Sequence, residues 1–352
     1  MAGSSVYVRT DSDQTTVIAP RLHVGAPVAD STRVDLVYTA DVWTSASIDI
    51  RSSASKTVDQ KVPKPVTEQR DEVNATLTQE WNDVSVSATY RYSHEYDYVS
   101  HGGTLNGSYA LAEKSTTLDL RLNFTFDDVG RAGDRSFNRN VRNLGARVGF
   151  TQLLDTDTFV QGAYELMSAH GFNSSAYRYV GLGSVNGLCN GEGMKHCLLE
   201  SNPTERLRHA LVANLRRALG EHFSFGLGYR FYLDSWNLSS HTALAELSYM
   251  PSTTLMFAVR YRFYLQGAAK HYRKTYETTA TDLRYYTNDK ELSPLSSHRL
   301  ALDIEKEVEL DDRGHHLTVV LSIAPSFYQF TNYAPLTSIN AFEATLATVL
   351  KL

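Results

Sequence analysis

The residues best suited to metal or redox chemistry are Cys189, His196 and Cys197, which share a segment rich in Gly and Asn. Two thiols this close along the chain can form a disulfide, which the oxidising outer face of a cell permits. With the imidazole they could instead bind a metal ion, but their irregular spacing matches no known zinc pattern. We predict the Cys189–Cys197 disulfide and no metal ion, with the three-ligand site as the alternative.

Nucleophilic catalysis would need a Ser or Cys beside a base and an orienting group. Ser and His are neighbours at Ser240-His241, at Ser297-His298 and within 170–174, but none of these segments repeats a known catalytic motif. Such neighbours arise by chance among 12 His residues. Gly181-Leu182-Gly183 lacks the flanking strand and helix of a phosphate loop, and the chain has no Cys-x-x-Cys-His for haem. We therefore expect neither an enzyme nor a cofactor.

Charged residues recur at every second position in several segments, which places them on one face if the backbone is extended. Arg260 and Arg262, for example, alternate with Val259, Tyr261 and Phe263. A helix would place Arg260 and Phe263 nearly on one side, where no single environment suits both. The charges that we assign to one such wall are Arg121, Arg206, Arg208, Arg230, Arg260, Arg262, Asp303, Glu305 and Glu307.

The apolar residues of this alternation form long ladders. One ladder runs from Leu118 to Phe126 and another from Phe223 to Leu233. Such strands extend over roughly 10–14 residues, longer than the ~5–6 of globular sheets and suited to a tilted membrane crossing. No stretch approaches the ~18–20 apolar residues that a membrane-spanning helix needs. The 21 Tyr residues would supply aromatic girdles at both membrane interfaces.

Short and long connections alternate along the chain, which is typical of bacterial barrels with short periplasmic turns and longer extracellular loops. The long connections cover 47–66, 169–203 and 266–295, and a shorter member of that set covers 95–103. The short set includes 25–27, 81–83, 155–157 and 220–222. We predict one all-β domain over 1–352, a closed antiparallel transmembrane β-barrel of about sixteen strands. Its first strand would be short, near Val6-Tyr7-Val8.

In such a barrel the charged wall faces the lumen. A basic wall near acidic strands would create a field that helps polar solutes to cross. Alternatively the charges pair across strands and hold a filled interior together. The net charge of -5 argues against a nucleic-acid partner. The opening residues MAGSSVYVRT lack a signal peptide, so an exported protein would have lost that segment.

Three segments carry a resemblance to a known family. They are 45–49 (SASID), Tyr232-Leu233-Asp234-Ser235-Trp236 with His241-Thr242-Ala243, and Asn288 to Ser293 leading into Ser296-Ser297-His298. On these residues the chain resembles an uncharacterised family of predicted outer-membrane barrels, DUF3570, over nearly its whole length. The segments fall at strand ends on the long-loop side, which suggests a packed loop cluster at the rim. The resemblance implies a small lipoprotein, or another periplasmic or extracellular protein, as a partner.

These observations predict an integral protein of the bacterial outer membrane, in contact with its lipids. The first functional hypothesis is a pore or transport channel for small polar solutes or ions. The alternative is a structural barrel that anchors a lipoprotein or a redox partner. The sequence does not choose a solute or an oligomeric state.

Overall fold

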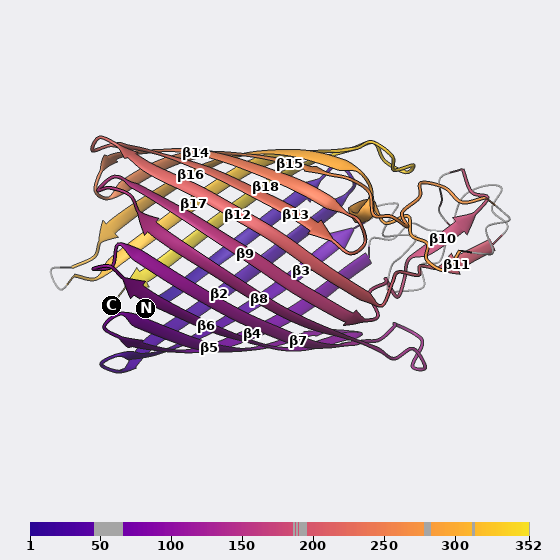
Figure 1. Ribbon diagram of the computed structural model, residues 1–352, viewed down its shortest axis with the longest axis horizontal. Coiled ribbons are helices and arrows are strands. Elements are labelled where there is room, and N and C mark those ends of the chain that lie inside the picture. The colour runs from indigo at the N-terminus through magenta and orange to yellow at the C-terminus, as the bar shows by residue number, and fades with distance from the viewer. Residues whose placement is uncertain are drawn as a thin grey trace.

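A computed structural model describes residues 1–45, 66–185, 187, 189, 196–277, 283–311 and 314–351. They form a closed barrel in which every strand is antiparallel to both neighbours (Figure 1). The sixteen barrel strands are β1 (Ala2–Asp11), β2 (Thr15–Ala29), β3 (Thr32–Ser45), β4 (Val66–Trp81), β5 (Val84–Glu95), β6 (Tyr98–Leu111), β7 (Thr116–Val129), β8 (Arg139–Leu153), β9 (Thr158–Gly171), β12 (Glu205–Leu219), β13 (Phe223–Asp234), β14 (Ser239–Ser252), β15 (Leu255–Gln266), β16 (Leu295–Glu309), β17 (His316–Phe330) and β18 (Ser338–Lys351).

The barrel closes where the first strand meets the last. β1 pairs with β18 from Ala2↔Leu350 through Asp11↔Ala341, and on its other side with β2. The first strand is therefore a full barrel strand, not the short one that the sequence predicted. Closure means that each of the sixteen described barrel strands is paired on both sides, so the barrel sheet itself offers no open edge to another chain.

The apolar ladders face outward. Leu118, Leu122 and Phe126 on β7 keep 46%, 43% and 52% of their surface exposed, as expected for side chains that meet lipid. Their neighbours Asp119 and Arg121 point to the opposite face, toward the lumen. This alternation confirms the predicted transmembrane barrel.

Both termini lie at one end of the barrel, which we call the turn end, and the large connections project from the other, the loop end (Figure 1). Two connections differ from the prediction. Gly25 and Pro27 lie inside β2, which shifts register between Pro27 and Ala29, an irregularity that accommodates a proline near a strand end. At the loop end, Gly102 and Gly103 lie inside β6, and the connection from β5 is only 96–97. Gly103 is required there because the ring of Phe124 covers the space that a Cβ would occupy.

The connection 172–204 carries a small second sheet, β10 (Tyr179–Leu182) paired with β11 (His196–Leu199), which lies beyond the barrel wall (Figure 1). The connection 267–294 contains the 3-10 helix η1 (Lys290–Leu292). The described parts of these two connections are called the cap below. In the described ranges, no helix has the length and apolar character to cross a membrane. Most of the family segment 45–49 lies outside the described residues.

Candidate functional site

Three of the predicted wall arginines form ion pairs. On the lumen face Arg260 binds Asp303 through two hydrogen bonds of 2.7 Å. Arg230 reaches Glu165 at 3.0 Å, although the two residues are on strands separated by β12. Arg206, nearer the loop end, binds the buried Asp234. These contacts follow the interpretation in which charges pair across strands, and they brace the wall against collapse.

Other predicted wall residues have different surroundings. Arg208 contacts the Met167 sulfur, 3.2 Å away, and Arg262 has no carboxylate within ion-pair distance among the described residues. Arg262 also keeps its Nε buried without a hydrogen-bond partner. Glu307 lies 3.3 Å from His316, and Glu305 is half-buried on the same face of β16. Among the described residues, Arg208 and Arg262 are therefore two lumen-facing cations that form no direct ion pair with a carboxylate.

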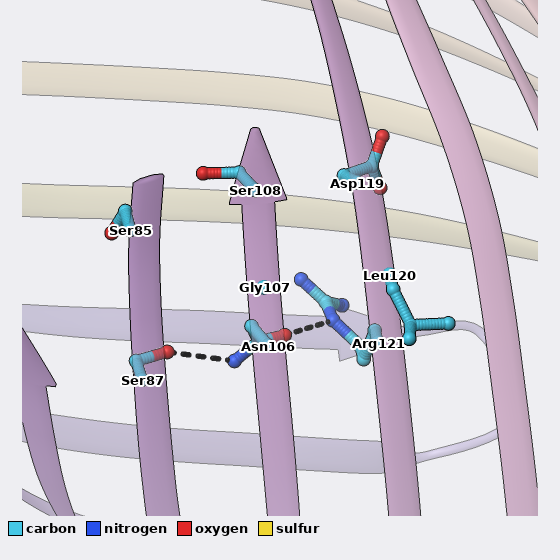
Figure 2. Close-up of a pocket in the computed structure, with 8 residues that line it drawn as sticks. All are labelled: Ser85, Ser87, Asn106, Gly107, Ser108, Asp119, Leu120 and Arg121. Carbon is cyan, nitrogen blue, oxygen red and sulfur yellow. Dashed lines mark hydrogen bonds between the residues drawn. The ribbon is translucent and has the colours of Figure 1, made fainter. Parts of the chain in front are cut away.

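Arg121 belongs to a polar chain on the lumen side of β5, β6 and β7. Its Nε donates to Asn106 at 2.7 Å, and the Asn106 amide donates to Ser87 at 3.0 Å (Figure 2). These side chains line a recess of about 150 Å³ in the wall. A hydrogen-bonded polar surface of this kind suits contact with water and hydrated solutes.

The lumen is accessible from the middle of the barrel toward its turn end. Arg216 retains 52% of its side-chain surface, Arg230 41% and Glu165 37%, although all three face inward. A lumen filled by protein would bury these side chains. The charged wall therefore borders open space.

Access narrows at the loop end. The Lys290 amine of η1 lies 3.9 Å from an Asp13 carboxylate beyond β1, and Gln266 donates to the Glu291 and Ser293 carbonyls. A cavity of about 460 Å³ remains beneath η1, between it and the inward side chains of β1 and β15–β17. The stretch of the cap around η1 therefore covers part of the mouth, and the cavity beneath it is also lined by Arg262.

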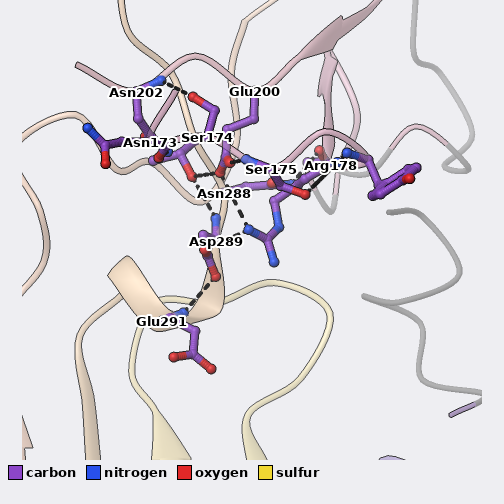
Figure 3. Close-up of polar contacts among 12 residues, drawn as sticks. Asn173, Ser174, Ser175, Arg178, Glu200, Asn202, Asn288, Asp289 and Glu291 are labelled. Atoms are coloured by element: carbon purple, nitrogen blue, oxygen red, sulfur yellow. Dashed lines mark hydrogen bonds and ion pairs between the residues drawn. The ribbon is translucent and has the colours of Figure 1, made fainter. Parts of the chain in front are cut away.

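A buried ionic network joins the two halves of the cap (Figure 3). Glu200, with 1% of its side chain exposed, accepts hydrogen bonds from the Ser175 amide and the Thr287 hydroxyl. Arg178 lies 3.6 Å from Glu200 and 2.6 Å from Asp289. Burial raises the pKa of Glu200, an effect that the neighbouring arginine opposes. One guanidinium thus holds two carboxylates from separate loops.

An apolar cluster anchors the cap to the barrel rim. Trp236 is 4% exposed and packs with Leu238, Tyr272 and Leu292. Its indole N–H donates to the Glu205 carbonyl at 2.9 Å. The Arg206 guanidinium lies over the ring, 4.2 Å from its centroid.

A family model described as "Protein of unknown function (DUF3570)" matches residues 5–145 and 138–323. The chain belongs to this family. No curated protein matches the chain in sequence.

Solved structures with the same fold are outer-membrane proteins. The DUF3570 chain superimposes on a bacterial polysaccharide outer membrane secretin with a TM-score of 0.52 and 8% identity, covering 100% of this chain and 99% of that one. It superimposes on the siderophore receptor PirA from Pseudomonas aeruginosa with a TM-score of 0.50 and 10% identity, covering 98% and 60%. At these identities the likeness concerns the barrel alone.

The DUF3570 structure also places the predicted cysteines and family segments. Cys189 and Cys197 form a disulfide with Cα atoms 5.6 Å apart, so their sulfurs are not free for the alternative metal site. Trp236 lies on the barrel rim and packs against the cap, and the stretch that starts at Asn288 belongs to the cap. Sequence reasoning placed these segments at the rim but missed Arg178 and Glu200, because nothing in the linear pattern marks two residues of a loop as partners.

Proposed function

We propose that this DUF3570 barrel is an integral outer-membrane pore for small polar solutes or ions, with no catalytic step of its own. The observation that carries the proposal is the exposure of charged side chains that face inward, such as Arg216 and Glu165. Similarity to outer-membrane barrels supports the location. The turn end would then face the periplasm and the cap the cell exterior.

The wall chemistry suggests a preference among solutes. Paired groups such as Arg260 and Asp303 offer polar contacts with little net field. Arg262 adds positive charge at the narrowed mouth, and Arg208 adds it in the wall recess that Glu165 and Arg230 also line. A low-dielectric wall strengthens the field of both groups. We therefore expect the pore to pass small anions more readily than small cations.

Planar-bilayer recording of the purified full chain tests this function. The expected result is discrete single-channel steps whose reversal potential in a KCl gradient indicates anion preference. The double variant Arg208→Gln/Arg262→Gln should reduce that preference, and Lys306→Gln/Lys351→Gln near the turn end serves as a charge-matched control for the loss of two cations. A folded barrel that never conducts would overturn the proposal.

A second function, anchoring a partner protein, is favoured by the cap itself. The β10–β11 sheet extends past the barrel (Figure 1), and a disulfide joins β11 to Cys189. Val185, three residues after β10, is 81% exposed. A small lipoprotein or another periplasmic or extracellular protein is the partner that we consider for this chain. Crosslinking in intact cells through a photoreactive residue at 185 would yield a defined adduct if the cap is a docking site. Absence of any adduct would count against anchoring at this surface.

A further inference from the structure

The lipid-facing surface carries a repeated Tyr–His pair. Tyr90, Tyr164, Tyr229 and Tyr261 each place the hydroxyl 2.6–2.7 Å from the Nδ1 of an imidazole on the next strand of the barrel. The four imidazoles, which we call the imidazole belt, belong to His101, His209, His241 and His298.

The geometry of the pair is the same in all four hairpins. Each Tyr is the seventh residue of its strand, and each His lies opposite the residue two positions further along, as His241 lies opposite Phe231. A fifth hairpin has the same arrangement with a carboxylate, in which Tyr38 donates to Asp71 at 2.6 Å. Packing of a globular core does not explain this regularity, because all five Tyr side chains are 38–54% exposed on the outer face.

Strand length places the belt at a membrane interface. A tilted strand crosses the hydrocarbon region in about 9–11 residues. Each imidazole faces the ninth residue counted from the turn end, so the belt lies where the hydrocarbon ends on the cap side. Hydrophobic side chains such as Leu227 and Val259 occupy the outer face closer to the turn end. The belt therefore meets lipid headgroups.

The hydrogen bond from Tyr determines what each imidazole can offer. A phenol that donates to Nδ1 fixes the proton of the neutral ring on Nε2. Among the described residues, none forms a hydrogen bond with the Nε2 atom of a belt imidazole, whose Nδ1 atoms take the Tyr hydroxyls. Arg142, exposed on the same outer face of β8 and two residues from Leu144, adds a guanidinium nearer the loop end. Together they present N–H donors to the headgroup layer, a pattern that suits phosphate oxygens.

We propose that the imidazole belt binds phosphate groups of the outer-leaflet glycolipid and so fixes the depth of the barrel in the membrane. Tyr90 and its equivalents act as positioning residues for the imidazoles. Asp71 replaces the imidazole on β3–β4 and would repel phosphate, so the lipid sites lie on the strands that carry the four imidazoles, from β6 to β16. The proposal rests on the outer-membrane location but not on conduction.

Native mass spectrometry of the full chain with added lipid A tests the proposal. The variant is fourfold His→Phe across the belt, which keeps the ring contacts with Tyr92, Phe231 and Phe263 but removes the donors. We expect at least about tenfold weaker binding of bisphosphorylated lipid A, consistent with the loss of several charge-assisted hydrogen bonds. Lipid A without phosphates should bind both proteins equally weakly.

Two further measurements make the result decisive. The fourfold Tyr→Phe variant at the positioning residues should weaken binding less than the His variant, and Tyr249→Phe at the turn end should have no effect. Inorganic phosphate at millimolar concentration should compete poorly, because it lacks the acyl chains. Equal retention of bisphosphorylated lipid A by wild type and the His variant, both folded as judged by heat-modifiable gel mobility, would overturn the proposal. Conductance of the same samples reports on the pore function separately.

Discussion

Replacement of Trp236 by Ala should release the cap from the barrel rim. The side chain is 4% exposed, and truncation of a buried Trp costs about 3–5 kcal/mol. The loss includes the indole hydrogen bond to the Glu205 carbonyl, which contributes about 1 kcal/mol. The barrel should remain closed, because its ladder hydrogen bonds do not involve the cap.

Amide hydrogen exchange can measure this release. The Lys270 amide donates to the Trp236 carbonyl and the Ala269 amide to the Leu292 carbonyl, so both report opening of 267–294. A loss of about 3 kcal/mol corresponds to an increase of more than about 100-fold in the open population, and hence in exchange at these amides. Trp236→Phe should give a smaller increase, because the apolar contacts persist.

Trp81→Ala is the matched control. Trp81 is 55% exposed at the turn end of β4, so its loss should leave exchange at Lys270 unchanged. Unchanged exchange at Lys270 and Ala269 in Trp236→Ala would show that the apolar cluster does not anchor the cap. Equal acceleration in both Trp variants would instead indicate general loosening, and would refute the assignment of a local role to Trp236.

Three other outcomes follow from the site. Because burial raises the pKa of Glu200, the folded cap binds a proton more tightly than the unfolded loops, so cap stability should fall as pH rises above 4.5. Amide hydrogen exchange in the cap, corrected for the pH dependence of the intrinsic exchange rates, measures this stability. Glu200→Gln should flatten its dependence on pH. Arg208→Glu/Arg262→Glu should shift the reversal potential toward cation preference, and an unchanged potential would remove these residues from the pathway. Cys189→Ser/Cys197→Ser should destabilise the β10–β11 sheet by about 2.5 kcal/mol, because the disulfide restricts the chain entropy of a short loop in the unfolded state. Limited proteolysis within 172–204 should then be faster, and an unchanged cleavage rate would contradict this prediction.

The barrel was predictable because its pattern is local. A period of two along 118–126 or 223–233 determines which side chains meet lipid, whatever the neighbouring strands contain. Strand ends were less predictable. Gly102 and Gly103 indicated a loop because glycine favours turns, but in β6 they accommodate rings and backbone from β7.

The site was only partly predictable, since it depends on which strands and loops meet. Alternation gave the inward direction of Arg260, but not that Asp303 on the next strand would pair with it, nor that Arg262 would have no such partner among the residues that the structure describes. The contact between Arg178 and Asp289 joins residues far apart in sequence, and no periodicity encodes it. The sequence contains the Tyr and His residues but does not indicate which Tyr faces which His. That pairing depends on the register between strands, which connections of different lengths determine.

The closing contact between β1 and β18 affects how the protein must assemble. The two strands pair over ten residue positions, yet they come from opposite ends of the chain. Until β18 is available, β1 and β17 each expose a full row of unsatisfied backbone groups, which bare hydrocarbon does not tolerate. During insertion, the unpaired backbone groups of β1 and β17 therefore need hydrogen-bond partners until the last hairpin has formed. Water or a strand of an assembly factor that pairs with them temporarily can supply these partners.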